Sequence, residues 1–469
     1  MNTKLPLLMM PLLLAGCSMA PRYHRPDLPV PAAFPTLAPT AAPGQQGAAV
    51  VSWKDFFHDP ALRQLIALSL DNNRDLRQAV ANVEAYRAQY RIQRADLLPS
   101  LQAGATGSLQ RVPADVAPTG QAGVYRQYGV QAGLTSYELD LFGRVRNLSK
   151  VALEHYLATE EARKGTQLTL IASVADAYFT WRIDRQRYDL ALQTRQSYDV
   201  SLNLVSEGVR NGVSTALDQR QAETALAGGL AQVERLRRIV ANDENALQLL
   251  LGAPIPKGLD AAFPLDTHAL ADLPAGLPAD LLVHRPDIQE AEHNLIGATA
   301  NIGVARAAFF PKITLTAAGG TESADMQNLF SGGQGAWSFA PQISLPIFSG
   351  GRLKAGLGYA RAEQSLLLSA YEKAIQVAFR EVADGLAARA TYGAQLGHQR
   401  DQVEKTASYL ALAQKSYHAG VETYLVVLDA QRSLYTTQDQ YLQDQLAQMS
   451  SQVALYKALG GGIEADPRS

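Results

Sequence analysis

Two stretches of this chain decide its fold, ADLLPSLQAGATG at residues 95–107 and AAFFPKITLTAAG at residues 307–319. In each, a run with helical spacing ends at a proline, Pro99 or Pro311, and apolar residues then alternate with polar or small ones. Proline ends a helix because it has no backbone N–H and its ring clashes with the preceding turn. An alternation with a period of two indicates a strand. Each stretch therefore predicts a helix that leads directly into a β-strand.

The two stretches belong to an internal repeat, in which residues 60–252 return about 210 positions later. The copies align with an offset of 212 as far as the first strands and with an offset of 208 from the long helices onward. Glycines and prolines match as well as alanines, which chance pairing of alanine-rich helices would not produce. The period lies outside the roughly 20 to 50 residues of solenoid and propeller repeats. We therefore predict a duplicated half-protein, with repeats at 53–252 and 279–462, a connector at 253–278 and a tail at 463–469.

The N-terminus has the features of an export signal. Lys4 precedes an apolar run, and Leu-Ala-Gly-Cys at residues 14–17 provides a small-residue cleavage site. The position of Cys17 resembles a bacterial lipobox, so we expect residues 1–16 to be removed and Cys17 to carry an N-terminal lipid. The alternative is an ordinary signal peptide followed by an unmodified cysteine. Residues 17–52 contain many prolines and are predicted to form an extended, lipid-anchored tether.

The composition argues against several classes of function. The 469 residues include 42 Lys and Arg against 44 Asp and Glu, a near balance that gives no reason to expect nucleic-acid binding. Cys17 is the only cysteine, which excludes disulfides and thiolate metal sites. The eight histidines have no metal-binding spacing, and the sequence contains no nucleophile elbow or phosphate loop. We therefore expect no catalytic residue, no metal and no cofactor other than the lipid on Cys17.

Each proline is followed by a predicted β-hairpin, the first at about 100–140 and the second at about 312–347. One face of each strand is apolar and the other carries small or polar residues, as where Ile313 and Leu315 alternate with Thr314. Strands of about ten residues with this alternation fit a bilayer-crossing β-barrel, with the apolar face toward lipid and the polar face toward a water-filled lumen. A half-buried sheet of a soluble protein would show the same alternation and is the alternative.

After each hairpin the helical pattern continues too far for a globular domain. It covers roughly 60 residues at 147–206, or about 90 Å at 1.5 Å per residue, and slightly more at 353–418. Each long helix turns at a glycine, Gly212 or Gly420, and returns through a second helix. Four membrane-spanning strands cannot close a barrel, and each unpaired amide in hydrocarbon costs several kcal/mol. The chain is therefore expected to oligomerise.

Six motifs carry a resemblance to a known family. They are WKDFFHDPALRQLI at 53–66, YELDLFGRVR at 137–146, RPDIQEAEHNL at 285–295, VARAAFFPKITLTAAGG at 304–320, WSFAPQISLPIFSGGR at 337–352 and GVETYLVVLDAQRSLY at 420–435. Together they resemble the TolC-like outer-membrane efflux proteins, in particular the lipoprotein branch similar to NodT and OprM. The match extends over nearly the whole chain after the signal.

The resemblance implies an internally duplicated α+β membrane protein. Each chain contributes four strands to a trimeric 12-stranded β-barrel and long helices to an α-helical periplasmic barrel. The expected location is the cell outer membrane, and the expected partners are outer-membrane lipid, two further copies of the chain, a periplasmic adaptor (membrane fusion) protein and an inner-membrane efflux pump. The implied function is the passive exit duct of a tripartite efflux system for drugs or other small molecules. The alternative is a lipid-anchored periplasmic adaptor or structural coiled-coil protein, which does not account for two amphipathic hairpins.

The resemblance also assigns a periplasmic gate to the two helical turns. Asp218 and Asp429 match acidic positions of the gate region, and Tyr417 matches a tyrosine that hydrogen-bonds to the residue at Asp218. In a trimer each aspartate would form a ring of like charges that attracts cations and is poised to open. The chain departs from the family pattern at Glu422, where an arginine is found, and at Val426, where a further aspartate is found. The alternative is that Asp218 and Asp429 only stabilise helix N-termini.

Overall fold

The computed structural model describes residues 18–34, 51–117, 120–259, 270–271, 273 and 285–462. Cys17, the signal at 1–16, the tail at 463–469 and most of the connector at 253–278 lie outside the described residues. The chain divides into two compact units. Unit 1 contains residues 1–27, 82–160 and 290–371, and unit 2 contains residues 28–81, 161–289 and 372–469.

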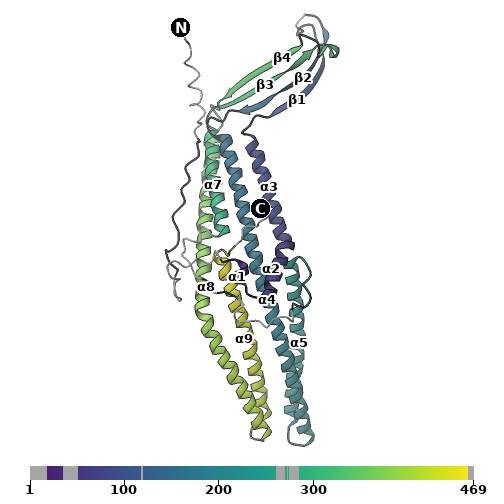
Figure 1. The fold of residues 1–469 in the computed structure, drawn as a ribbon, viewed down its shortest axis with the longest axis vertical. Helices are drawn as coiled ribbons and strands as arrows, with labels where there is room; N and C mark the ends of the chain where they lie inside the picture. The colour runs from purple at the N-terminus through teal and green to yellow at the C-terminus, as the bar shows by residue number, and fades with distance from the viewer. Residues whose placement is uncertain are drawn as a thin grey trace. The chain divides into compact units, whose positions relative to one another are not determined.

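Unit 1 carries a four-stranded antiparallel sheet with its strands in chain order (Figure 1). The strands are β1 (Leu101–Val112), β2 (Gly123–Glu138), β3 (Lys312–Ser323) and β4 (Gly335–Ser344), with a short 3₁₀ turn, η3 (Met326–Asn328), between the last two. Both predicted hairpins are therefore present. The pairing of β2 with β3 joins the two repeats, and β1 and β4 form the edges of the sheet.

The apolar face of this sheet is exposed in the chain. Trp337, Phe339 and Ile343, which alternate along β4, are 83%, 60% and 69% exposed. A soluble sheet would bury this face against another layer of secondary structure. Large apolar side chains that stay exposed along a whole strand instead mark a surface that meets lipid or another protein. The exposure therefore favours the membrane-spanning interpretation of the alternation.

Two glycines set the spacing between β2 and β3. A Cβ atom on Gly320 would overlap the carbonyl oxygen of Val130 and lie 2.6 Å from the Cα of Gln131. A Cβ atom on Gly133 would overlap the backbone of β3 in the same way. The pairing register shifts between Leu134 and Tyr137, where β2 contains a bulge and Ser136 has a φ of 47°. The backbones approach too closely here for any residue with a side chain.

The two helices that precede Pro99 and Pro311 end shortly before these prolines, as predicted. α3 (Arg74–Ala95) ends four residues before Pro99, and α7 (Pro286–Ala307) ends four residues before Pro311. In unit 1 the described N-terminal residues 18–27 pack against α7, where Arg25 forms an ion pair with Glu292 at 2.7 Å. The whole described stretch 18–34 forms no helix or strand, as expected for a tether.

Unit 2 is helical. Its shorter helices are α1 (Trp53–Phe56) and α2 (Pro60–Asn72), and its helical hairpins combine parts of α4 (Arg144–Arg210) and α8 (Arg352–His418) with α5 (Ala216–Leu251) and α9 (Tyr424–Ala458) (Figure 1). α4 and α8 are 67 residues each, slightly longer than predicted. Within the described part of the chain, no helix combines the length and the apolar character needed to cross a membrane.

The two repeats fasten the ends of their returning helices in the same way. Asn73 donates a hydrogen bond to the carbonyl of Leu250 at 2.9 Å, and Arg285 donates to that of Ala458 at 2.9 Å. These pairs occupy equivalent positions in the repeats, near the C-termini of α5 and α9. The bonds satisfy carbonyls that a helix end leaves without an intrahelical partner. The duplication is thus visible in individual contacts of unit 2.

Candidate functional site

The two helical turns of unit 2 have the same backbone conformation. Gly212 and Gly420 follow the ends of α4 and α8 with φ angles of 74° and 72°. The N–H of the next residue, Val213 or Val421, donates to a carbonyl five residues back, at 2.8 Å and 2.9 Å. Glycine is favoured at such a helix C-terminus because left-handed φ values strain other residues. The repeat therefore builds two equivalent tips.

The N-termini of the returning helices differ between the tips. Thr215 and Asp218 form a capping box at the start of α5, in which Asp218 N donates to Thr215 Oγ1 at 3.2 Å and Thr215 N donates to Asp218 Oδ2 at 3.0 Å. Thr423 begins α9 without a side-chain cap. Val426 stands at the position equivalent to Asp218, and because its side chain has no acceptor oxygen the reciprocal half of a capping box cannot form there; its N–H donates to the carbonyl of Thr423 at 3.2 Å. Within the chain, the half-buried Asp218 has the capping role that the alternative interpretation gives it.

Tyr417 contacts a different residue from the one predicted. Its hydroxyl lies 3.3 Å from Ser214 Oγ, which links the tip of the second repeat to that of the first. Among the described residues of this chain Tyr417 forms no hydrogen bond with Asp218, and the predicted bond between them stays a prediction for the assembled channel. The bond is absent within the chain because Thr215 holds the Asp218 carboxylate at the helix N-terminus, with its hydroxyl donating at 2.7 Å.

The other two predicted gate residues are exposed. Asp429 lies in the second turn of α9, and Glu422 lies in the turn that precedes it. Within the described chain neither carboxylate forms a hydrogen bond or an ion pair. The basic residues Arg210 and Lys415 lie in the last turns of α4 and α8. The tips therefore present acidic side chains close in sequence to cationic ones, on two rigid hairpins.

A buried cluster holds the two tips together. Its members come from all four helices of the hairpins: Tyr198, Val205, Ala222, Ala225, Ala413, Tyr424, Val427, Leu428 and Ala430. Gln431, which is 4% exposed, adds hydrogen bonds from α9 to Ser197 and Ser201 on α4 at 2.9 Å and 3.0 Å. The first and second repeats thus pack directly against each other below the turns. One tip can therefore move relative to the other only if the side chains of this buried cluster shift against each other.

A half-buried charge cluster lies elsewhere in unit 2, and the sequence analysis missed it. Arg187 on α4 donates to Asp184 at 2.7 Å and to Asp439 on α9 at 2.7 Å. On α5, burial and the neighbouring carboxylate of Asp184 raise the pKa of Asp243 to about 6. Four charged residues spread over more than 200 positions have no signature in a single sequence, and only the packing of three helices brings them together.

The raised pKa of Asp243 predicts a pH dependence. The folded protein holds the proton more tightly than the unfolded chain, so this group's contribution to stability is fully present in acid and is lost as the pH rises through about 6. Between about pH 4 and about pH 6.5 we expect this group to lower the thermal unfolding midpoint of the purified protein. Asp243→Asn, which is neutral throughout, should flatten that slope, whereas the control Asp401→Asn should not. An unchanged slope in Asp243→Asn would contradict the assignment.

The exposed four-stranded sheet of unit 1 and the helical hairpins of unit 2 together define a class of protein, a membrane β-barrel component with long helical hairpins. Groups of His, Cys, Asp and Glu that could hold a metal ion are absent from the residues that the structure describes. The chain belongs to the outer membrane efflux protein family, whose model matches residues 65–253 and 277–461. The predicted family, fold class and outer-membrane location are confirmed. The chain is an outer-membrane efflux channel, and the role of its family is transport.

Relatives of this channel include proteins with named efflux roles. The antibiotic efflux pump outer membrane protein ArpC and the toluene efflux pump outer membrane protein TtgC, both of Pseudomonas putida, are each 52% identical to the chain over 453 residues, which cover 96% of this chain and 93% of theirs. The open state of the MtrE outer membrane channel of Neisseria gonorrhoeae has a TM-score of 0.86 at 40% identity and covers 95% of this chain and 98% of that one.

Proposed function

We propose that three copies of this chain close one barrel and form the exit duct of a tripartite efflux system. The observation that carries this proposal is the sheet itself, whose outer strands β1 and β4 are unpaired edges and whose apolar face is exposed. Open edges are not tolerated in hydrocarbon. Three copies of a four-stranded sheet supply twelve strands, an even number within the range of bacterial barrels.

A periplasmic adaptor and an inner-membrane pump complete the proposed system, and transport through the channel is passive. Two relatives with the same identity to this chain are named for antibiotic and for toluene efflux. This difference in substrate supports a duct for small organic molecules whose selectivity lies in the pump. A lipid on Cys17 anchors each chain in the membrane, and no catalytic step is part of the proposed function.

Purified protein tests the duct. A heat-sensitive trimer on unheated gels, together with ion conductance in planar bilayers, is the expected result for a channel. The rival function, a lipid-anchored adaptor or coiled-coil protein, predicts membrane attachment without conductance. Extraction of the protein from outer membranes as a monomer that conducts no current would therefore refute the proposal and favour the rival. Replacement of Cys17 with serine, followed by mass spectrometry of the N-terminal peptide, tests the lipid anchor separately.

Within this channel we propose that the tips at Gly212 and Gly420 form the periplasmic gate. Three-fold symmetry would repeat Asp218, Asp429 and Glu422 around one axis, and like charges in a ring repel. The link between Tyr417 and Ser214 and the buried cluster below the turns oppose that repulsion. Packing between the tips then favours the closed state, and repulsion between the carboxylates favours the open one. Any change that loosens the packing of the tips would shift this equilibrium toward opening.

Removal of the gate carboxylates takes away the repulsion that favours opening and the attraction for cations, so single-channel conductance in planar bilayers is expected to fall. Asp218→Ala also removes the reciprocal half of the capping box of α5, in which Asp218 accepts from Thr215, while the Thr215 side chain can still cap the helix. Asp218→Asn keeps an oxygen for Thr215, so a comparison of the two variants separates charge from capping. Asp429→Ala, which has no cap to lose, should act through charge alone. Asp401→Ala is the matched control, and wild-type conductance in all of the Asp218 and Asp429 variants would refute the gate.

A further inference from the structure

The end of the sheet where all four strands join helices is strongly cationic. The four connecting segments at 91–101, 138–150, 306–312 and 345–354 hold nine Lys and Arg against three Asp and Glu, although the whole chain has a formal charge of −2. The cations are Arg91, Arg94, Arg144, Arg146, Lys150, Arg306, Lys312, Arg352 and Lys354. Because antiparallel strands bring all four junctions to one end, this excess is concentrated in one belt of unit 1.

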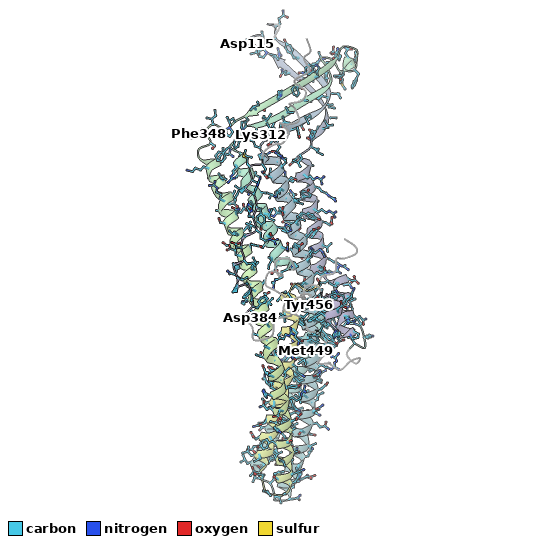
Figure 2. All side chains as sticks on the ribbon, turned by 60° about the vertical axis from the view of Figure 1, so that its left-hand side comes forward. Asp115, Lys312, Phe348, Asp384, Met449 and Tyr456 are labelled. Atoms are coloured by element: carbon cyan, nitrogen blue, oxygen red, sulfur yellow. The ribbon has the colours of Figure 1, made fainter. Side chains whose placement is uncertain are left out.

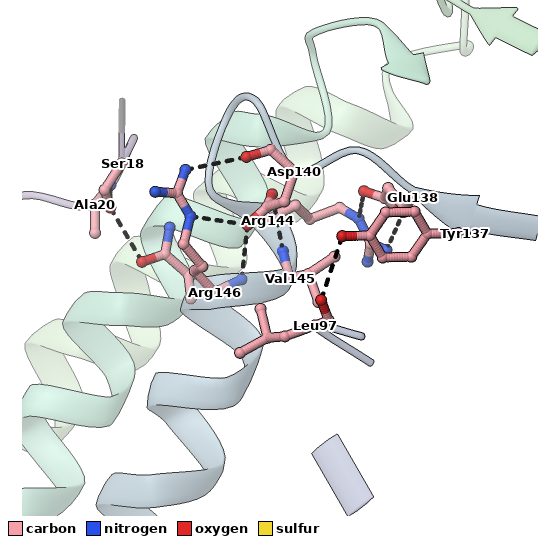
Figure 3. Close-up of polar contacts among 10 residues, drawn as sticks. Ser18, Ala20, Leu97, Tyr137, Glu138, Asp140, Arg144, Val145 and Arg146 are labelled. Atoms are coloured by element: carbon pink, nitrogen blue, oxygen red, sulfur yellow. Dashed lines mark hydrogen bonds and ion pairs between the residues drawn. The ribbon is translucent and has the colours of Figure 1, made fainter. Parts of the chain in front are cut away.

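Part of the belt is neutralised by its own acids. Glu138 accepts from Arg144 at 2.8 Å and 2.5 Å, and Arg146 pairs with Asp140 at 3.1 Å (Figure 3). These residues point toward one another at the β2–α4 junction. Glu138 also pairs with Lys312 of β3 at 3.2 Å. The acids of the belt are therefore largely occupied, and the excess charge lies on cations elsewhere in it.

The β4–α8 junction, LPIFSGGRLK at 345–354, combines unpaired cations with exposed apolar side chains. Ile347 and Phe348 are 94% and 91% exposed, and Figure 2 shows Phe348 at the same end of the sheet as Lys312. Arg352 and Lys354 are exposed, and neither forms an ion pair with any described residue. Gly350 and Gly351, with φ of 56° and 84°, form the turn between the two kinds of side chain.

We propose that this junction is a binding site for anionic phospholipid in the periplasmic leaflet of the outer membrane. The chain is an outer-membrane channel with a periplasmic helical extension, so the helix end of the sheet lies at that leaflet. Exposed apolar side chains such as Phe enter the boundary between headgroups and acyl chains, and Lys and Arg favour anionic headgroups. Ile347 and Phe348 insert beside the acyl chains, while Arg352 and Lys354 bind the lipid phosphate. Phosphatidylglycerol carries a net negative charge and fits this pairing, whereas phosphatidylcholine does not.

Native mass spectrometry of the purified full-length protein, titrated with short-chain phosphatidylglycerol or phosphatidylcholine, tests the proposal. We expect phosphatidylglycerol to bind more tightly, and each of Arg352→Gln and Lys354→Gln to reduce that preference about fivefold, which corresponds to about 1 kcal/mol per cation. Phe348→Ser should weaken both lipids and leave their ratio unchanged. The matched control is Lys405→Gln, an exposed cation of unit 2 paired with Asp401.

The outcomes separate the lipid from other anions. Equal binding of the two lipids, or an unchanged preference in both glutamine variants, would overturn the proposal. Displacement of phosphatidylglycerol by millimolar inorganic phosphate would overturn it too, because the site would then bind free phosphate. Circular dichroism of each variant establishes that a lost preference does not reflect loss of fold. The lipid preference is measured whether the protein is a trimer or a monomer, so failure of the proposed assembly would be seen separately.

Discussion

Arg285→Met is expected to cost about 2–3 kcal/mol of stability, because a buried guanidinium that donates charge-assisted hydrogen bonds to three acceptors is lost, while its two carboxylate partners stay partly solvated. Arg285 is 6% exposed and binds Asp287 at 2.9 Å and 2.6 Å, Glu381 at 2.8 Å and the carbonyl of Ala458 at 2.9 Å. Methionine fills a similar volume but donates no hydrogen bond. Both carboxylates and the end of α9 would lose their donor together. The thermal unfolding midpoint of the purified protein, followed by circular dichroism, measures the loss.

Arg380→Met is the control for this substitution. Arg380 pairs with Asp384 at 3.9 Å and is 69% exposed, and exposed pairs contribute about 0–1 kcal/mol. Arg285→Lys should fall between the two variants, because an ammonium group keeps the charge but cannot reach three acceptors with the geometry of a guanidinium. Similar midpoints for Arg285→Met and Arg380→Met would show that the buried cation does not hold the helices of unit 2 together.

Gly320→Ala is expected to prevent normal assembly of the sheet. Its Cβ atom would overlap the carbonyl oxygen of Val130 and lie 2.6 Å from the Cα of Gln131, so the backbones of β2 and β3 would have to separate. A small sheet that already exposes its apolar face has little other packing to compensate. The amount of folded protein in the outer membrane, measured as the heat-sensitive species on unheated gels, should fall severely.

Gly319→Ala provides a matched control one residue away. Side chains alternate between the two faces of a strand, and a Cβ atom on Gly319 meets nothing within 4 Å. This variant should reach the outer membrane at the wild-type level. If Gly320→Ala also does so, the close approach of β2 to β3 is not a requirement of the fold.

Much of the fold could be predicted because it depends on local signals. Pro99 and Pro311 mark the helix-to-strand transitions wherever the rest of the chain lies, and Gly212 and Gly420 mark the helical turns in the same way. Alternation alone did not distinguish a membrane-facing hairpin from a half-buried sheet of a soluble protein. The membrane-facing role became clear from exposed residues such as Trp337, since exposure depends on which elements cover a strand.

The candidate site was only partly predictable. The position of the tips and their acidic residues followed from the repeat and from the family resemblance. The partners of Tyr417 and Asp218 did not, because Ser214 reaches Tyr417 only through packing between repeats and Thr215 competes locally for the carboxylate. Arg187 and its partners were missed for a similar reason, since α4 and α9 are far apart in the chain.

The order of strands in the sheet has a consequence for how the proposed channel is made. Since β1 to β4 follow the chain order, each protomer can complete its ribbon of strands without waiting for a neighbour. Every seam between protomers is then the same, β4 of one chain against β1 of the next. The barrel therefore closes by association of sheets that have already folded. The rate of this association should rise with the density of protomers in the membrane, whereas the rate at which each sheet folds should not.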